Sequence, residues 1–314
     1  MATSNGSLCN ISGSVSENGS WIGCMESDIE QGAVPAVQAW IANLLIPVNI
    51  LNIFANFLVI LAVTRTSHLQ EPAHKLIANL AVADFLMGVQ GTFVSPTTFL
   101  IEFPPKIICL GHFSLGTLSG LASTNSLIAI NVDRYIAISR PLLYYQIVTP
   151  RVILVMVVLA WSFAFFASVM TLIGNRWQPD QPCMYDTVTS RASIICTSLV
   201  IGTCGVAIIS IYAYIMMIAK HHQQQIHPNP SNSGSQELAK TFGIVVGAFF
   251  VCWDPYFIMM LLSVADVYHD TVGVARGLGY LLVYSNSCMN FFIYAAKSSQ
   301  FRAAFRAVLP SRGR

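Results

Sequence analysis

An acidic residue and an arginine stand side by side at Asp133 and Arg134, directly after residues 107–132, which include no Asp, Glu, Lys or Arg. In a helix of unknown context such a pair predicts a salt bridge at a helix end. Arginine stays protonated and offers five donors, so it can exchange one set of acceptors for another. Because ionisable groups beside a long apolar stretch are costly and usually functional, the pair also suits a molecular switch.

A second acid, Asp84, lies inside another apolar stretch, residues 76–100. A carboxylate in such surroundings must be neutralised, hydrogen-bonded or paired with a cation. Its position therefore predicts either a cation site or a protonated carboxyl group in a polar network with Asn56 and Asn290.

Membrane helices are the elements that would position these residues. The 314 residues are 54% hydrophobic and 10% charged, which leaves too little polar surface for a soluble globule of this length. The apolar runs are long enough to cross a bilayer as helices, and they lack the short alternating segments of a membrane β-barrel. We expect an all-α membrane protein, a bundle of seven transmembrane helices near 39–64, 76–100, 107–132, 152–175, 192–219, 241–265 and 277–296.

The distribution of positive charge predicts how the bundle is oriented. Twelve of the sixteen Lys and Arg residues fall on one side of the spans, as is typical of cytoplasmic loops. We expect a multi-pass plasma-membrane protein whose N-terminal tail, residues 1–37, is extracellular and lacks a cleavable signal. The tail carries N-glycosylation sequons at Asn5, Asn10 and Asn18. The bundle is predicted over 38–296, and a cytoplasmic amphipathic helix with the C-terminus over 297–314.

Two cysteines are well placed to form a disulfide. Cys109 lies at the outer start of the third span and Cys183 in the loop after the fourth, both on the side that faces an oxidising compartment. Whether Cys9 and Cys24 form a second bridge stays open. No basic tract suits nucleic acid, so membrane lipid is the partner expected for the apolar surface.

The polar residues inside the spans resemble, one set per helix and in chain order, the signatures of rhodopsin-like (class A) G-protein-coupled receptors. They are Asn56, Asp84, Asp133-Arg134-Tyr135, Trp161, Cys252-Trp253-Asp254-Pro255 and Asn290-Phe291-Phe292-Ile293-Tyr294. The resemblance covers residues from about 38 to 309. The run that follows Asp133 is most similar to the amine and adenosine receptors. Cys204, Phe291 and Gly116 depart from that pattern, which has a proline in span five, a proline in the last span and an amine-binding aspartate in span three.

The resemblance implies a switch at the cytoplasmic ends of the helices. Asp133 would hold Arg134 at rest, and activation would turn Arg134 towards a heterotrimeric G protein. Ser235 stands where many relatives have an acid that locks this arginine, which predicts a weak lock. Cys204 and Thr124 replace larger partners of Phe249, which predicts some ligand-independent activity. The other switch and coupling residues implied are Tyr135, Pro141, Leu142, Tyr212, Pro255 and Tyr294.

For Asp84 the resemblance implies an allosteric sodium ion, and no other cofactor is expected. The residues that match its remaining ligands are Ser123, Asn286, Ser287 and Asn290. Five matching polar positions favour the ion site over a protonated Asp84.

The resemblance also places a ligand pocket in the outer halves of four spans. The matching residues are Gly116, Thr117, Gly120, Cys196, Thr197, Val200, Trp253, Tyr256, Phe257, Met260, Arg276, Tyr280 and Tyr284. The set is largely apolar and contains no acid, so the unknown extracellular ligand is not expected to be a conventional biogenic amine. Arg276 would meet a carboxylate or phosphate, or remain a solvated charge at the rim. Asp254, beside Pro255, is expected to face a neighbouring helix or the lipid.

A G-protein-coupled receptor, which is not an enzyme, is therefore the predicted function. The alternative is a membrane transporter or channel with the same topology, but no repeat or row of acids at the midplane is present. A membrane hydrolase is a third alternative, and the sequence has no Gly-x-Ser-x-Gly motif to favour it.

Overall fold

The computed structural model describes residues 21–93, 101, 103–181, 183–225, 233–265 and 273–309. It describes the backbone alone for residues 21–39, 42, 219–225, 233–242, 273–274 and 276. The sequons, Cys9 and the side chains of Cys24, Ser235 and Arg276 lie outside this description. In the described residues the structure is helical, with one isolated bridge between Asn175 and Thr189.

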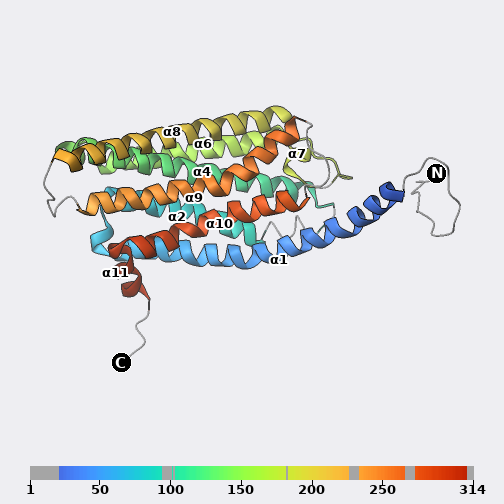
Figure 1. Cartoon of the computed structure of the whole chain (residues 1–314), viewed down its shortest axis with the longest axis horizontal. Coiled ribbons are helices and arrows are strands. Elements are labelled where there is room, and N and C mark those ends of the chain that lie inside the picture. The colour runs from blue at the N-terminus through green and yellow to red at the C-terminus, as the bar shows by residue number, and fades with distance from the viewer. Residues whose placement is uncertain are drawn as a thin grey trace, which may run out of the picture.

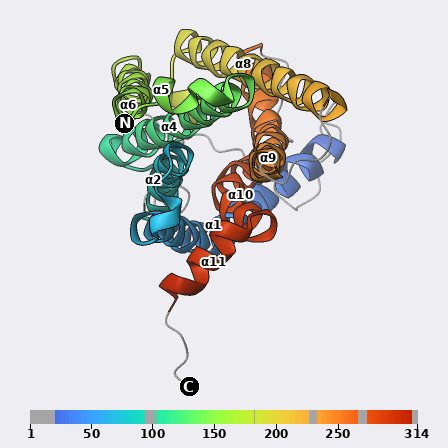
Figure 2. The same cartoon turned by 90° about the vertical axis from the view of Figure 1, so that its left-hand side faces the viewer.

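Seven long helices run along the long axis of the molecule (Figure 1). Their bounds are α1 Trp21–Arg65, α2 Pro72–Phe93, α4 Lys106–Ser139, α6 Pro150–Ile173, α8 Arg191–Gln225, α9 Ser233–Val264 and α10 Gly273–Lys297. Seen from one end, they form a ring in which α10 closes against α1 (Figure 2). Helix α4 contacts α2, α6, α8 and α9, so it is the central member of the bundle.

Six of these helices are long and apolar enough to cross a membrane, counted over the described residues. The exception is α10, whose inner half carries Ser285, Asn286, Ser287 and Asn290. Three of these polar side chains are buried in the bundle, so the polarity of α10 reflects its inward face. The predicted all-α bundle is confirmed, and α10 is the helix that its composition identifies least clearly.

Helix boundaries follow local sequence signals. Thr149 caps α6 by accepting a hydrogen bond from the Val152 backbone N–H at 3.4 Å, and Pro150 occupies the first turn. Ser298 caps the short helix α11, Ser299–Val308, in the same way. Helix α11 packs its buried Phe301 against Tyr294, with ring centroids 5.0 Å apart. The predicted amphipathic helix is therefore present, and it lies against α1 and α10.

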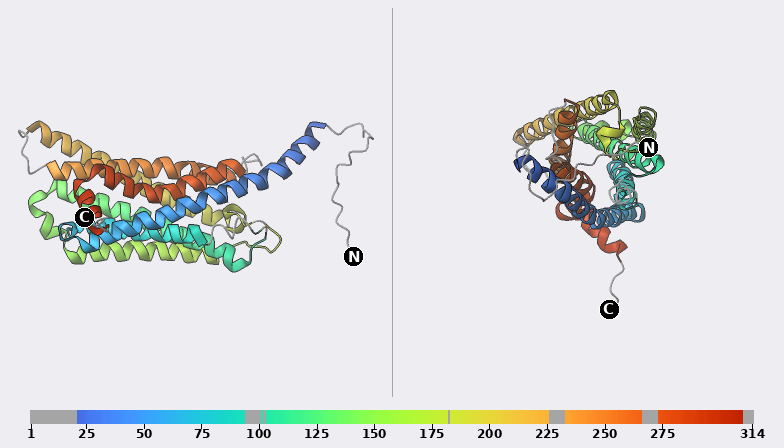
Figure 3. Two further views of the ribbon diagram at one scale, coloured as in Figure 1. Left: turned by 90° about the horizontal axis from the view of Figure 1, so that it is seen from below. Right: turned by 90° about the vertical axis from the view of Figure 1, so that its right-hand side faces the viewer.

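Several helices extend beyond the predicted spans. Helix α1 begins at Trp21, ahead of residue 38, while its candidate span covers only Asn43–Arg65. In Figure 3 its first turns project past the rest of the bundle. Beyond the predicted spans 192–219 and 241–265, α8 continues to Gln225 and α9 begins already at Ser233.

Two buried cores occupy the two ends of the bundle. One contains Cys109 and Tyr185, and we call this end of the molecule the bridge end. The other contains Tyr144 and Phe301, and we call it the Arg134 end. Trp253 packs against both cores, so one side chain connects the two ends.

Candidate functional site

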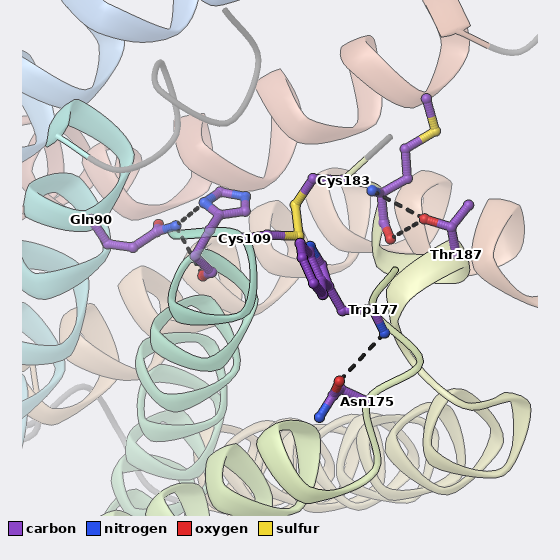
Figure 4. The surroundings of a disulfide bond; sticks show 8 residues. Gln90, Cys109, Asn175, Trp177, Cys183 and Thr187 are labelled. Carbon is purple, nitrogen blue, oxygen red and sulfur yellow. Dashed lines mark hydrogen bonds between the residues drawn. A yellow bond between two sulfur atoms is a disulfide. The ribbon is translucent and has the colours of Figure 1, made fainter. Parts of the chain in front are cut away.

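The predicted disulfide joins Cys109, in the first turn of α4, to Cys183. Figure 4 shows Trp177 beside the bridge, with its backbone N–H donating to Asn175 Oδ1 at 3.3 Å. The bridge holds the segment that leads into the short helix α7, Tyr185–Val188. Tyr185 thereby reaches a cavity that opens inside the ring at this end.

The cavity is lined by residues of α2, α4, α8, α9 and α10 and by Tyr185. It contains ten of the thirteen predicted pocket residues, namely Gly116, Thr117, Gly120, Thr197, Trp253, Tyr256, Phe257, Met260, Tyr280 and Tyr284. At Gly120 a Cβ atom would lie 2.9 Å from the Trp253 ring, so only glycine lets the indole approach α4 this closely. The structure thus brings these ten residues together around one cavity, and its role as a ligand site stays a prediction.

Two predicted pocket residues of α8 do not line the cavity. Cys196 is exposed on the outer surface, and Val200 packs beside the cluster formed by Ala83, Leu121, Ala122 and Ala164. The residues of α8 that do line the cavity are Ile194, Thr197, Ser198 and Ile201, which repeat at helical spacing. Cys196 and Val200 were predicted for the pocket, whereas other positions of α8 line this cavity.

A polar network that the sequence analysis missed crosses the cavity wall. The Tyr284 hydroxyl donates to Gln90 Oε1 at 2.7 Å, and Gln90 Nε2 lies 2.5 Å from His112 Nδ1. Gln90 Nε2 also donates to the His112 carbonyl oxygen at 3.1 Å, and Figure 4 shows both contacts of Gln90. The sequence did offer a signal for this network, because Gln90 and His112 are polar residues in two consecutive predicted spans.

The described residues that line the cavity include no Asp, Glu, Lys or Arg. Burial raises the pKa of Tyr185, while hydrogen bonds with Thr197 and Thr117 oppose part of that change. The phenol therefore stays neutral at physiological pH. The cavity offers apolar and aromatic surface with hydroxyl and amide groups.

Asp84 lies deeper in the bundle, where its side chain is 0% exposed. Ser123 and Ser287 each donate to Asp84 Oδ1 at 3.0 Å, and Asn290 Nδ2 donates to Oδ2 at 2.7 Å. Asn286 is buried nearby but makes no hydrogen bond to Asp84 among the described contacts. Three of the four expected neighbours thus surround the carboxylate directly.

Asn56 joins this group through the backbone rather than through Asp84. Its Nδ2 donates to the Ser287 carbonyl oxygen at 3.0 Å and to Asn52, while its Oδ1 is buried without a partner among the described residues. No described cationic side chain contacts Asp84. The donor set, one buried carboxylate with two hydroxyls and an unpaired amide oxygen, suits a hard cation that prefers oxygen ligands.

The predicted contact between Phe249 and Trp253 is present on α9. The two rings stack with centroids 5.6 Å apart, and Phe249 is buried. Two residues later, Pro255 lies inside the helix and lacks the N–H that would close the local turn. In this stretch of α9, Trp253 of the cavity wall therefore lies two residues from Pro255, where one backbone hydrogen bond of the helix is missing.

The Arg134 end holds the acid–arginine pair. Arg134 Nε donates to Asp133 Oδ2 at 2.9 Å, and both side chains are buried. Tyr144, in the short helix α5 Tyr144–Ile147, donates its hydroxyl proton to Asp133 Oδ1 at 2.8 Å. Burial and the adjacent Asp133 carboxylate raise the pKa of Tyr144, so its phenol remains a donor. The sequence analysis missed Tyr144, because this residue lies between two predicted spans and carries no charge.

The other predicted coupling residues take different environments at this end. Leu142, in the 3-10 turn Pro141–Leu143, is 94% exposed. The Tyr212 hydroxyl occupies the space beside Gly243 of α9, and the Tyr294 hydroxyl is buried without a partner among the described residues. Tyr135 contacts Tyr214, with ring centroids 5.7 Å apart. The role of Tyr212 and Tyr294 as later contacts of Arg134 stays a prediction.

Comparison with known proteins supplies the family context for these sites. The family model described as "7 transmembrane receptor (rhodopsin family)" matches residues 55–294. Melanocortin receptor 5 of Mus musculus is 26% identical over 313 residues, which cover 94% of this chain and 92% of the relative. The alpha-1A adrenergic receptor of Oryzias latipes is 28% identical, with 87% of this chain and 67% of the relative covered. Because these similar relatives carry different receptor names, they name no ligand for this chain.

Proposed function

Because the chain belongs to the rhodopsin family of seven-transmembrane receptors, we propose that it carries the signal of a neutral extracellular ligand to heterotrimeric G proteins. The broad class follows from the family: the chain is a G-protein-coupled receptor and a multi-pass membrane protein. The family consists of signalling receptors rather than enzymes, and the transporter or channel alternative has no support. Beyond this class, we propose how the chain is oriented in the membrane, what kind of ligand it binds and which residues transmit the signal.

The ligand enters from the bridge end, which faces outside in the plasma membrane. A protonated amine needs a buried counter-charge, and no carboxylate is among the described residues of the cavity wall. A neutral, largely apolar molecule would gain from the aromatic surface. Its hydrogen-bonding groups would meet hydroxyl and amide groups such as Thr117 and Gln90.

Signalling requires Arg134 to leave Asp133. The arginine trades its bonds to one carboxylate for acceptors on the G protein, and Asp133 keeps the hydrogen bond from Tyr144. Trp253 contacts the ligand cavity and both cores, so its displacement by ligand reaches the Arg134 end through α9. A hinge motion of α9 at Pro255 would give the bundle a second, signalling conformation.

Asp84 would hold a sodium ion together with Ser123, Ser287, Asn290 and Asn286. The ion would supply a positive charge that neutralises the buried carboxylate. Reorienting the two serine hydroxyls would turn their oxygen atoms from donors to Asp84 into ligands of the ion. The buried, unpaired oxygen of Asn56 is a further acceptor in the same polar region.

The observation that carries the coupling proposal is the 94% exposure of Leu142 beside the buried Asp133–Arg134 pair. An apolar side chain so exposed gains about 1.5–3 kcal/mol on burial in a partner. We expect Leu142→Asp to lower nucleotide exchange on purified G protein by about tenfold or more, with the receptor in lipid discs. Arg134→Ala should lower exchange at least as much.

Leu143→Asp is the matched control, because Leu143 lies in the same turn but is only 45% exposed. An equal loss in both leucine variants would assign the effect to charge in the loop instead of an apolar contact. If Leu142→Asp and Arg134→Ala exchange nucleotide like the parent on every G-protein class, coupling through this end is wrong. The cavity would then have to be connected to another output.

A further inference from the structure

Asp254 is a carboxylate on the outside of the bundle at the middle of a span. It is the twelfth of the 22 residues in the candidate span Gly243–Val264 of α9. Its side chain is exposed, between Val251 and Ile258, which are 71% and 57% exposed on the same face. Figure 2 shows α9 as a member of the ring, between α8 and α10, so this face points away from the bundle.

Nothing within the described bundle neutralises Asp254. No described side chain forms an ion pair or hydrogen bond with it. Either end of the span lies about 15 Å away along the helix, at 1.5 Å per residue. An aspartate side chain has a single methylene group and cannot cover that distance to reach water, unlike a lysine or arginine.

The backbone supplies a second unsatisfied acceptor on this face. Pro255 has no N–H, so the carbonyl oxygen of Val251, four residues earlier, loses its normal helical donor. Val251 is also the more exposed of the two outward residues that flank Asp254. In hydrocarbon each unsatisfied polar group costs several kcal/mol, so both acceptors favour a donor brought from outside the chain.

We propose that this face of α9 docks a partner transmembrane helix that carries a lysine or arginine at mid-bilayer depth. A Lys ammonium group has three donors and one positive charge, so it can bond Asp254 and the Val251 carbonyl together. Val251 and Ile258 provide apolar contact on both sides of the charge. A second copy of this chain in the same position would bring Asp254 against Asp254, where like charges repel, so charge complementarity favours a basic partner.

The proposal is tested with the full-length receptor in lipid discs and a synthetic Leu/Ala helix of about 20 residues as the probe. One peptide carries Lys at its centre, and its matched control carries Leu there. Energy transfer between dyes on peptide and receptor reports association. We expect the Lys peptide to bind the parent about tenfold more tightly than the Leu peptide, and Asp254→Asn to remove the difference.

A register shift separates a specific contact from general attraction. In the double variant Asp254→Leu, Ile258→Asp the acid moves one helical turn along the same face. Its tightest partner should become the peptide whose Lys is moved by four residues. Thermal unfolding of each variant verifies that it remains folded.

Three outcomes overturn the proposal. Equal binding of the Lys and Leu peptides to the parent would show that Asp254 is neutral in lipid and needs no partner. Unchanged preference in Asp254→Asn would place the contact elsewhere. Energy transfer between differently labelled receptors that disappears in Asp254→Asn would assign the face to a second copy. None of these outcomes depends on G-protein coupling.

Discussion

Asp84 and Asp254 are the same residue type in two membrane-spanning helices, yet one lies in the polar interior and the other on the outer face. Asp84 receives hydrogen bonds from Ser123, Ser287 and Asn290, whereas Asp254 receives none from any described residue. The difference is one of helix rotation, because each residue turns the side chain by about 100°. An acid in a span therefore has no fixed role until its face is known.

The largest expected effect separates the two aspartates directly. Asp84→Leu should lower the free energy of unfolding by about 3 kcal/mol or more, because three buried donors lose their acceptor at about 1–3 kcal/mol each. Asp254→Leu should not lower it, because no described residue loses a hydrogen-bond partner and an apolar side chain suits the apolar surroundings of the span. Thermal unfolding of both purified variants in one detergent measures the contrast. Similar losses would mean that Asp254 is packed inside the bundle.

The cavity network extends the comparison to uncharged groups. Gln90→Leu should cost about 1–3 kcal/mol, since it removes the buried hydrogen bonds that Gln90 makes with the Tyr284 hydroxyl and with His112. Thr203→Val is the outward counterpart, because the exposed Thr203 hydroxyl bonds only carbonyl groups of its own helix. It should be close to neutral when both variants are followed by the same melting assay. A neutral Gln90→Leu would indicate that water replaces the glutamine.

At the Arg134 end, Tyr144 and Tyr145 allow the same contrast between a buried, hydrogen-bonded side chain and an exposed one. Tyr144→Phe removes the hydrogen bond to Asp133, which is worth about 1 kcal/mol, and should raise ligand-independent nucleotide exchange about fivefold. Tyr145 is exposed and serves as the control through Tyr145→Phe, which should leave exchange unchanged. Basal exchange at matched receptor amounts is the measurement. An unchanged rate in Tyr144→Phe would show that Asp133 alone restrains Arg134.

The last contrast concerns sodium. At a concentration ten times its dissociation constant, an ion that binds only the folded state adds about 1.4 kcal/mol of stability. NaCl should therefore raise the melting temperature more than choline chloride does, and Asp84→Asn should abolish this difference. Asp254→Asn should keep it, since that residue lies on the outer face. Equal responses of the parent to both salts would contradict the ion site.

Sequence reasoning succeeded where one helix or one short segment carries the signal. Charge-free runs predicted the spans, and the positions of Cys109 and Cys183 predicted the disulfide. It failed where a residue's face depends on helix register, as for Cys196 and Val200 of α8. Helix α8 contains no proline as a landmark, and each residue turns a helical side chain by about 100°, so the face on which Cys196 and Val200 lie was not fixed by their positions in the sequence.

The sequence by itself determined the helices, their apolarity and the adjacent Asp133–Arg134 pair, because these depend on neighbouring residues and on hydrophobic burial. Tertiary structure alone decided which polar groups meet. Tyr284 bonds Gln90, which lies 194 residues away in the sequence, and Tyr144 reaches Asp133 from the short helix α5. Such contacts depend on how each helix is rotated against its neighbours, and that rotation is set by packing across the whole bundle. For the same reason, packing placed Asp84 inside the bundle and left Asp254 on its outer face.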